Sequence, residues 1–75
     1  MSKLPLLSAK QLIKILKKMS FTLKRQKGSH AFFEHPDGRT TLVACHQGEV
    51  IDRGLLNKII KHDLKITRED FHNYT

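Results

Sequence analysis

The fold is decided by residues 21–45, FTLKRQKGSHAFFEHPDGRTTLVAC, in which two turn signals separate three runs of apolar, aromatic and β-branched residues. Phe21 and Leu23 alternate with polar residues, which predicts a half-buried first strand. The pair Gly28-Ser29 breaks this strand, and the tetrapeptide HPDG at 35–38 forms the second turn. Three strands are therefore expected, at residues 21–27, 31–34 and 40–45. Because short turns join them, the strands form an antiparallel sheet.

Helical patterns flank this segment on both sides. Residues 8–11 read S-x-x-Q, the form of a capping box, and predict a helix that begins near Ala9. Apolar residues continue it at helical spacing, at Leu12, Ile13, Leu16 and Met19. A second long helix is expected from about Gly54, and Thr67 can cap a short last helix. The order α-β-β-β-α, with two helices on one face of a three-stranded antiparallel sheet, is an α+β fold of the double-stranded-RNA-binding-domain type, and residues 1–75 are expected to form a single domain.

Composition and charge restrict the possible functions. The chain has 75 residues, a mass of 8.7 kDa and a formal net charge of +7, so it is too short for a second domain. Residues 1–30 contain eight cations and no acid, whereas the remainder of the chain has a net charge of −1. Such a concentration indicates an anionic partner, most commonly nucleic acid, and the alternative is a solvated helix face.

The sequence does not support other classes of site. A single cysteine, Cys45, allows no intramolecular disulfide, and no paired Cys and His spacing indicates zinc, so neither a metal nor a cofactor is expected. No apolar run approaches the roughly 20 residues that span a bilayer, and no signal peptide opens the chain. The sequence therefore predicts a cytoplasmic protein without a membrane partner.

The segment RQKGSH at 25–30 contains the residues that could perform chemistry. His30 can exchange a proton near neutral pH, and Arg25 and Lys27 can stabilise a phosphoryl charge. Gly28 permits the close approach of another backbone or of a phosphate. Together these residues resemble a ribonuclease site. The alternative is an exposed strand histidine beside solvated lysines, and six residues alone do not decide between the two.

Successive landmarks of the sequence resemble the HicA family, the small toxins of HicA-HicB toxin-antitoxin systems. The landmarks are LPLLS at 4–8, RQKGSH at 25–30, HPDGRT at 35–40, VACH at 43–46 and GLL at 54–56 with Ile59. They cover roughly residues 3–71 in uninterrupted order, with departures from the family pattern at Ala44 and Leu55. The resemblance implies a double-stranded-RNA-binding-like fold, cleavage of messenger RNA that arrests translation, and neutralisation by a HicB-like antitoxin.

The resemblance also implies roles for individual residues. Within the GSH tripeptide, Gly28 shapes the turn, Ser29 is its neighbour, and His30 is the catalytic histidine, acting as general acid or general base. His46 corresponds to a family histidine, or it is a structural residue at a strand end. From the charge pattern, three cations of the first strand are expected to contact RNA: Lys24, Arg25 and Lys27.

The remaining histidines and the turn acids are interpreted as structural or solvated. Turn and cap preferences explain Asp37 and Asp52, and Cys45 on an apolar strand is expected to be a small core residue. The histidines in this group are His35, His62 and His72.

Three functions fit the sequence. The leading one is a toxin that acts as an endoribonuclease without a metal, since the sequence contains no carboxylate cluster with ligand spacing. The second is a non-catalytic RNA-binding module of the same fold, and the third is an adaptor whose basic face docks an acidic protein. His30 separates them, because an enzyme loses most of its rate without it, whereas a binding protein keeps its affinity.

Overall fold

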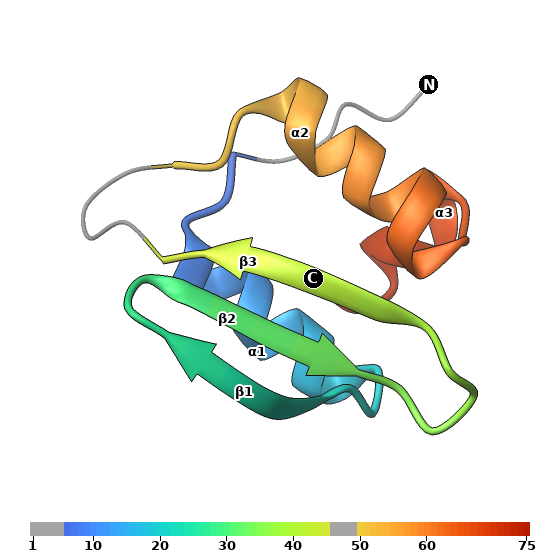
Figure 1. The fold of residues 1–75 in the computed structure, drawn as a ribbon. Helices are drawn as coiled ribbons and strands as arrows, with labels where there is room; N and C mark the ends of the chain where they lie inside the picture. The colour runs from blue at the N-terminus through green and yellow to red at the C-terminus, as the bar shows by residue number, and fades with distance from the viewer. Residues whose placement is uncertain (1–5, 46–49) are drawn as a thin grey trace.

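The computed structural model describes residues 6–45 and 50–75. Its elements follow in the order α1 (Ala9–Lys18), β1 (Thr22–Lys27), β2 (His30–Glu34), β3 (Thr40–Ala44), α2 (Arg53–Lys58), the π-helix η1 (Ile59–Leu64) and α3 (Arg68–His72). Figure 1 shows the sheet in front of α1, with the C-terminal helices along the β3 side. The predicted α-β-β-β-α order and the three-stranded antiparallel sheet are confirmed.

The first helix, α1, begins where the sequence predicts. The Ser8 hydroxyl accepts a hydrogen bond from the Gln11 backbone N–H, and the Gln11 side chain accepts one from the Ser8 N–H at 2.9 Å, which completes the capping box. One side of the helix is buried, through Ala9, Leu12, Ile15 and Leu16. The lysines of α1 are exposed, so the helix is amphipathic with a basic outer side.

A tight turn after α1 directs the chain into the sheet. Ser20 adopts a positive φ of 75°, the Ser20 N–H donates to the Lys17 carbonyl, and the Phe21 N–H donates to the Leu16 carbonyl at 2.9 Å. These bonds form a Schellman motif, which usually has glycine at the position of Ser20. The turn places the Phe21 side chain in the core, where it is 1% exposed.

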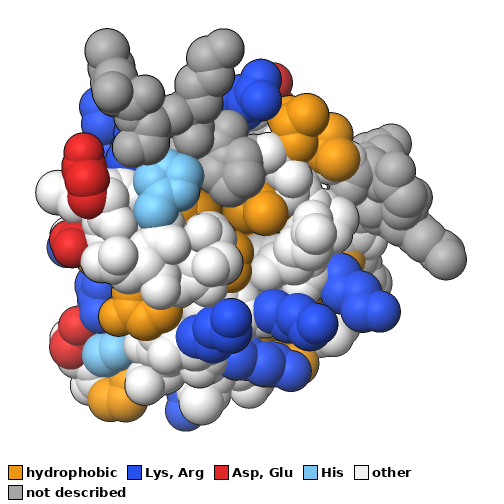
Figure 2. Space-filling view, turned by 180° about the vertical axis from the view of Figure 1, so that it is seen from behind, with side chains coloured by type: hydrophobic (Ala, Val, Ile, Leu, Met, Phe, Trp, Pro, Cys, Tyr) orange, Lys and Arg blue, Asp and Glu red, His pale blue; other side chains and the backbone are white. Residues whose placement is uncertain are grey.

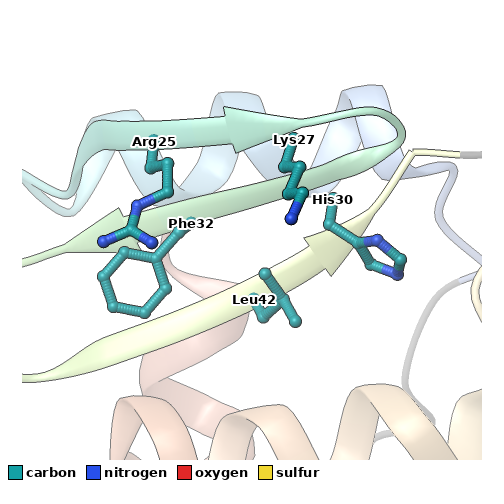
Figure 3. A pocket seen from close by; sticks show the side chains of 5 residues that line it. All are labelled: Arg25, Lys27, His30, Phe32 and Leu42. Carbon is teal, nitrogen blue, oxygen red and sulfur yellow. The ribbon is translucent and has the colours of Figure 1, made fainter.

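The sheet has the order β1-β2-β3 and two unlike faces. Ala31, Phe33 and Val43 point toward the helices and are buried, while His30, Phe32 and Leu42 alternate with them on the opposite side. We call this opposite side the open face, because no helix formed by residues 6–45 or 50–75 covers it (Figures 1 and 3). The two faces explain the alternating burial observed along β2 and β3.

β1 differs from the half-buried strand predicted from sequence. All of its residues are exposed, and the buried Phe21 precedes it. Leu23 pairs with Phe33 on the covered side but remains 48% exposed. The physical reason is that the sheet has two edge strands, β1 and β3, and the helices pack mainly against β3, which leaves the inward side of β1 largely uncovered.

The HPDGR turn between β2 and β3 is a structural junction. Arg39 Nε donates to Asp37 Oδ2 at 2.8 Å, while another guanidinium nitrogen donates to the Leu64 carbonyl at the end of η1. The guanidinium also lies 5.4 Å from the centre of the Phe21 ring. Hydrogen bonds from the backbone N–H and the guanidinium of Arg39 lower the pKa of Asp37. His35 Nδ1 accepts from the Asp37 N–H, so the structural roles expected for His35 and Asp37 are confirmed.

The C-terminal half is helical, but it is not the single long helix expected from about Gly54. α2 begins at Arg53 and is capped by Asp52, whose carboxylate accepts from the backbone N–H groups of Gly54 and Leu55. From Ile59 the helix widens into η1, with no proline or glycine there to signal the change. The cap role expected for Asp52 is confirmed, as is that of Thr67 at α3.

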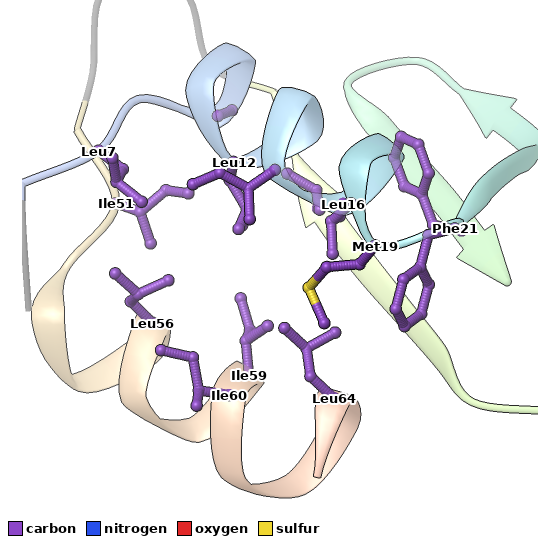
Figure 4. Packing of buried hydrophobic residues seen from close by; sticks show 14 of the residues in the cluster. Leu7, Leu12, Leu16, Met19, Phe21, Ile51, Leu56, Ile59, Ile60 and Leu64 are labelled. Carbon is purple, nitrogen blue, oxygen red and sulfur yellow. The ribbon is translucent and has the colours of Figure 1, made fainter. Parts of the chain in front are cut away.

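One hydrophobic cluster joins the helices to the covered side of the sheet (Figure 4). Burial of each large apolar side chain stabilises the fold by about 1.5–3 kcal/mol. Phe71 of α3 is completely buried and packs against this cluster. The largest fully buried side chains are Phe21, Phe33, Phe71, Leu12, Leu16, Leu56, Ile60, Leu64 and Val43. Within residues 6–45 and 50–75, no helix has the length and apolarity needed to cross a bilayer.

Candidate active site

A shallow hollow of about 300 Å³ lies on the open face of the sheet. All three strands contribute to it: Arg25 and Lys27 from β1, His30 and Phe32 from β2, and Leu42 from β3. Figure 3 shows these side chains projecting from the same side of the sheet, with the helices behind. The hollow therefore combines two cations, an imidazole and an apolar floor.

The strand register arranges the residues of this face in two rows. The histidine row consists of Lys27, His30 and Ala44, and the aromatic row consists of Arg25, Phe32 and Leu42. Residues directly opposite each other on antiparallel strands have Cβ atoms about 4.5–5.5 Å apart. Each row thus contains one cation from β1 next to a ring from β2, and the backbone ladder fixes this arrangement.

A β-bulge in β1 brings the cations to the open face. Thr22 and Leu23 pair with Glu34 and Phe33, but the next pair is Arg25 with Phe32, so Lys24 is an extra residue. Regular alternation from the inward Leu23 would have turned both Arg25 and Lys27 toward the helices. Because one extra residue reverses the facing of everything after it, the bulge places these two cations beside Phe32 and His30.

The turn between β1 and β2 fixes the start of the histidine row. Gly28 has a φ of 60° and is the first of the two loop residues, the position at which a type II′ hairpin turn requires glycine. A Cβ added to Gly28 would meet nothing within 4 Å, so the glycine serves the backbone conformation. The Ser29 carbonyl accepts from the Cys45 N–H at 2.6 Å, which ties the turn to the end of β3.

His30 is the first residue of β2, just beyond the turn, and its side chain is exposed. Within the described ranges 6–45 and 50–75, no side chain or backbone group hydrogen-bonds to its imidazole. The ring is accessible from solvent and stands across from Lys27 (Figure 3). An imidazole in this setting can transfer a proton to or from a bound phosphodiester while a neighbouring ammonium stabilises its charge.

Lys24 is separated from the other two cations with which it was grouped. It lines a second hollow of about 320 Å³, at the opposite end of the β1-β2 pair, with Thr22, Glu34, His35 and Pro36. This second hollow contains the acid Glu34, whereas, among the described residues, the hollow with His30 is lined by cations and apolar residues without an acid. Of the three cations expected to contact RNA, Arg25 and Lys27 share the hollow with His30, and Lys24 does not.

Other candidate residues fall in different settings. Cys45 is half-buried against the core cluster, as expected for a small core residue. His62 lies exposed on η1. His46 lies outside the described residues. Over the part of the chain that the structure describes, no group of three His, Cys, Asp or Glu side chains is arranged to hold a metal ion.

Sequence reasoning missed two residues of the hollow, Phe32 and Leu42. The signal was available in the pair Phe32-Phe33, because neighbouring strand residues face opposite ways and only one of the two rings can enter the core. Leu42 is similarly flanked by the buried Thr41 and Val43. Strand alternation therefore predicts an apolar floor on the open face once the inward residues are assigned.

A second basic surface lies on α1. Its lysines recur at helical spacing and are exposed, and we call them the lysine stripe: Lys10, Lys14, Lys17 and Lys18. Figure 2, which views the molecule from behind, shows Lys and Arg side chains gathered over the region of α1. Because α1 packs on the covered side of the sheet, the stripe and the hollow with His30 face opposite directions.

Comparison with models of protein families identifies a related family. Residues 9–64 match a family model described as the HicA toxin of bacterial toxin-antitoxin systems. The matched segment runs from the first residue of α1 to the last residue of η1 and so includes the whole sheet. A search of curated proteins found no match.

Proposed function

The chain belongs to the HicA toxin family of bacterial toxin-antitoxin systems, and from this premise we propose that it is an endoribonuclease that cleaves messenger RNA and thereby arrests translation. The observation that carries the proposal is the histidine row, in which the accessible imidazole of His30 stands across from the ammonium of Lys27. Arg25 adds a second cation in the same hollow. A phosphodiester bound there meets a proton-transfer group and positive charge together.

The proposed reaction uses the RNA itself as the nucleophile. The 2′-oxygen forms a bond to phosphorus as the bond to the 5′-oxygen breaks, which leaves a 2′,3′-cyclic phosphate and a free 5′-hydroxyl. His30 either removes the proton from the 2′-hydroxyl or delivers one to the leaving 5′-oxygen, and solvent water makes the other proton transfer. Lys27 and Arg25 stabilise the charge that develops on the phosphoryl oxygens. Because two fixed cations supply this charge, we propose that the reaction needs no divalent metal.

We also propose a partner protein, a cellular compartment and a domain organisation for the chain. A HicB-like antitoxin would neutralise the toxin by covering the open face, since blocking the hollow denies RNA access to His30. The protein would act in the cytoplasm, where messenger RNA is found and where a free thiol such as Cys45 stays reduced. We further propose that residues 1–75 act as a single domain.

The test is cleavage of a messenger RNA by the purified protein in excess EDTA, followed by analysis of the product ends. We expect cleavage with cyclic or 3′-phosphate ends, and a rate about 10²–10⁴-fold lower for His30→Ala. His62→Ala, which removes another exposed histidine, is the matched control and should cleave normally. Full inhibition by EDTA or 5′-phosphate ends would contradict the metal-free mechanism.

The alternative function, a non-catalytic RNA-binding module, makes a different prediction for the same proteins. A binding module would retain RNA affinity in His30→Ala and would show no cleavage by the unmodified chain. An adaptor for an acidic protein would bind no RNA at all. Induction without an antitoxin in a bacterial host completes the test, because only the nuclease arrests growth through His30.

A further inference from the structure

The open face has an apolar floor that folding does not explain. Phe32 is half-buried and Leu42 is 52% exposed, although the core lies on the other side of the sheet. Both residues line the hollow that contains His30. Phe32 and Leu42 are cross-strand partners, so they form a contiguous apolar surface bordered by the cations Arg25 and Lys27. Such a surface is typical of a binding site, here for a ligand with apolar as well as anionic parts.

The shape of the floor identifies the apolar part of that ligand. Phe32 stands between Arg25 and Leu42 in the aromatic row, and in Figure 3 its ring turns a flat side away from the helices. A flat aromatic surface of this kind favours stacking of another planar ring. The flanking guanidinium and the neighbouring ammonium of Lys27 favour negative charge beside that ring. A nucleobase joined to phosphates combines both properties.

The spacing along β2 relates this floor to the candidate catalytic group. His30 and Phe32 are two residues apart on one strand and face the same side, so their Cα atoms are about 7 Å apart. This distance is comparable to the length of one nucleotide in an extended strand. A phosphate at His30 and Lys27 therefore leaves its neighbouring base over Phe32.

We propose that Phe32 and Leu42 form a stacking site for an unpaired base next to the scissile phosphate, and that the RNA is single-stranded where it is cleaved. The inference rests on the proposed function for the identity of the scissile phosphate. In a duplex, both faces of each base are covered by neighbouring base pairs and the sheet cannot reach them. Exposed bases of single strands stack on aromatic side chains, and this contact does not require a particular sequence.

Binding measurements in the His30→Ala background test the stacking site without cleavage. The probes are a short single-stranded oligoribonucleotide, the same ribose-phosphate backbone without bases, and the oligonucleotide paired with its complement. We expect removal of the bases to raise the Kd about five-fold or more, and the duplex to bind more weakly than the single strand. Phe32→Ala should raise the Kd for the normal strand by a similar factor and abolish the difference between the strands with and without bases.

Further variants separate stacking from a general loss of structure. Phe32→Tyr keeps the aromatic ring and should restore binding. Leu42→Ala should weaken binding, whereas Leu55→Ala, which changes an equally exposed leucine on α2, should not. The comparison of strands with and without bases can be made with the His30→Ala protein alone. It therefore still tests whether the bases contribute to binding if Phe32→Ala fails to fold.

The outcomes distinguish this inference from the proposed function. The stacking site would be overturned if removal of the bases changed the Kd equally for the His30→Ala protein with Phe32 and for the same protein with Phe32→Ala. It would also be overturned if duplex RNA bound as tightly as single-stranded RNA. Either result would leave cleavage through His30 intact. If the unmodified chain binds single strands through their bases but cleaves none, the nuclease proposal fails while the stacking site is supported.

Discussion

The open face of the sheet and the lysine stripe of α1 are both basic, but their charges stand in different surroundings. Arg25 and Lys27 project from paired strands beside His30 and the apolar floor. The lysine stripe contains four ammonium groups on one helix without an acid or an aromatic ring among them. The two surfaces face opposite directions (Figures 1 and 2).

This difference leads us to expect separate roles for the two surfaces: the lysine stripe attracts RNA, and the open face performs the chemical step. Flexible lysines on a helix attract a phosphate backbone from a distance and in many orientations, which raises affinity and association rate. In the proposed function, catalysis needs a phosphate held against His30 in one geometry, and we expect the paired strands to hold it there. We therefore expect the same loss of charge to have unequal consequences on the two surfaces.

The largest expected effect comes from neutralising two cations on each surface. Arg25→Gln with Lys27→Gln should lower kcat by about 100-fold or more, because in the proposed reaction both groups stabilise the charge that develops on the phosphoryl oxygens. Lys14→Gln with Lys17→Gln removes the same charge from α1. This second pair should leave kcat unchanged, weaken binding, and reduce the salt slope by about 0.7 for each lost phosphate contact. Cleavage rates at saturating RNA and binding across a salt series measure both effects.

Lys24→Gln is a third variant for this comparison, because Lys24 neighbours Arg25 in sequence but lines the other hollow. It should keep the cleavage rate of the parent. Equal losses of kcat from the two double variants would show that total charge, rather than position on the open face, determines the rate. A large loss from Lys24→Gln would extend the site toward the HPDGR turn.

Much of the fold could be predicted from sequence because its signals are local. The capping box at Ser8 and Gln11, the turn at HPDG and the caps at Asp52 and Thr67 each depend on residues within a few positions of one another. The π-helix from Ile59 could not be predicted, since its apolar residues fit ordinary helical spacing equally well. The exposure of β1 was also missed, because strand order within the sheet is not a local property.

The site was only partly predictable for a related reason. His30 and its turn follow from the motif, but which side of the sheet the cations occupy depends on the bulge at Lys24. Period-two alternation from Phe21 gives the opposite facing for Arg25 and Lys27. No proline or glycine in β1 marks the bulge, so only the register with β2 reveals it.

The next effect concerns the turn that aligns the histidine row. Gly28→Ala should cost about 1–3 kcal/mol of stability, because alanine is strained at the positive φ of this turn. Gly38 also has positive φ with open space around it, so Gly38→Ala is the matched control with a similar loss. Only Gly28→Ala should also lower the cleavage rate at temperatures where the protein remains folded. Equal cleavage rates for the two variants would show that the conformation of the Gly28 turn does not affect the candidate site. Thermal unfolding and cleavage assays provide the two measurements.

A smaller effect of opposite sign is expected at the end of α1. Ser20 occupies the left-handed position of the Schellman motif, where glycine avoids the steric cost that a side chain incurs. Ser20→Gly should therefore raise the free energy of unfolding by about 0.5–1 kcal/mol, since the greater flexibility of unfolded glycine offsets part of the gain. Urea denaturation measures the change. Cleavage should stay constant because Ser20 belongs to the α1 end of the molecule, and an altered kcat would contradict the independence of the two regions.

The smallest effect distinguishes two arginines at the sheet, Arg39 and Arg25. Arg39 is engaged by Asp37, whose pKa is lowered from its ordinary value of 3.8 by the backbone N–H and the guanidinium of Arg39. A carboxyl group with a lower pKa in the folded state binds fewer protons than in the unfolded state. Its contribution to stability is therefore present above about pH 4 and is lost as the pH falls through the folded-state pKa.

Urea denaturation at several pH values should consequently show that parent and Asp37→Asn differ near neutral pH and converge in acid. Arg25 forms no ion pair within the described part of the chain, so Arg25→Gln should leave the pH dependence of stability below pH 4 unchanged. A pH-independent difference between parent and Asp37→Asn would mean that the Asp37 charge does not stabilise the turn. If Arg25→Gln changed the acid dependence instead, Arg25 would be held within the fold and would not be free to bind a phosphate.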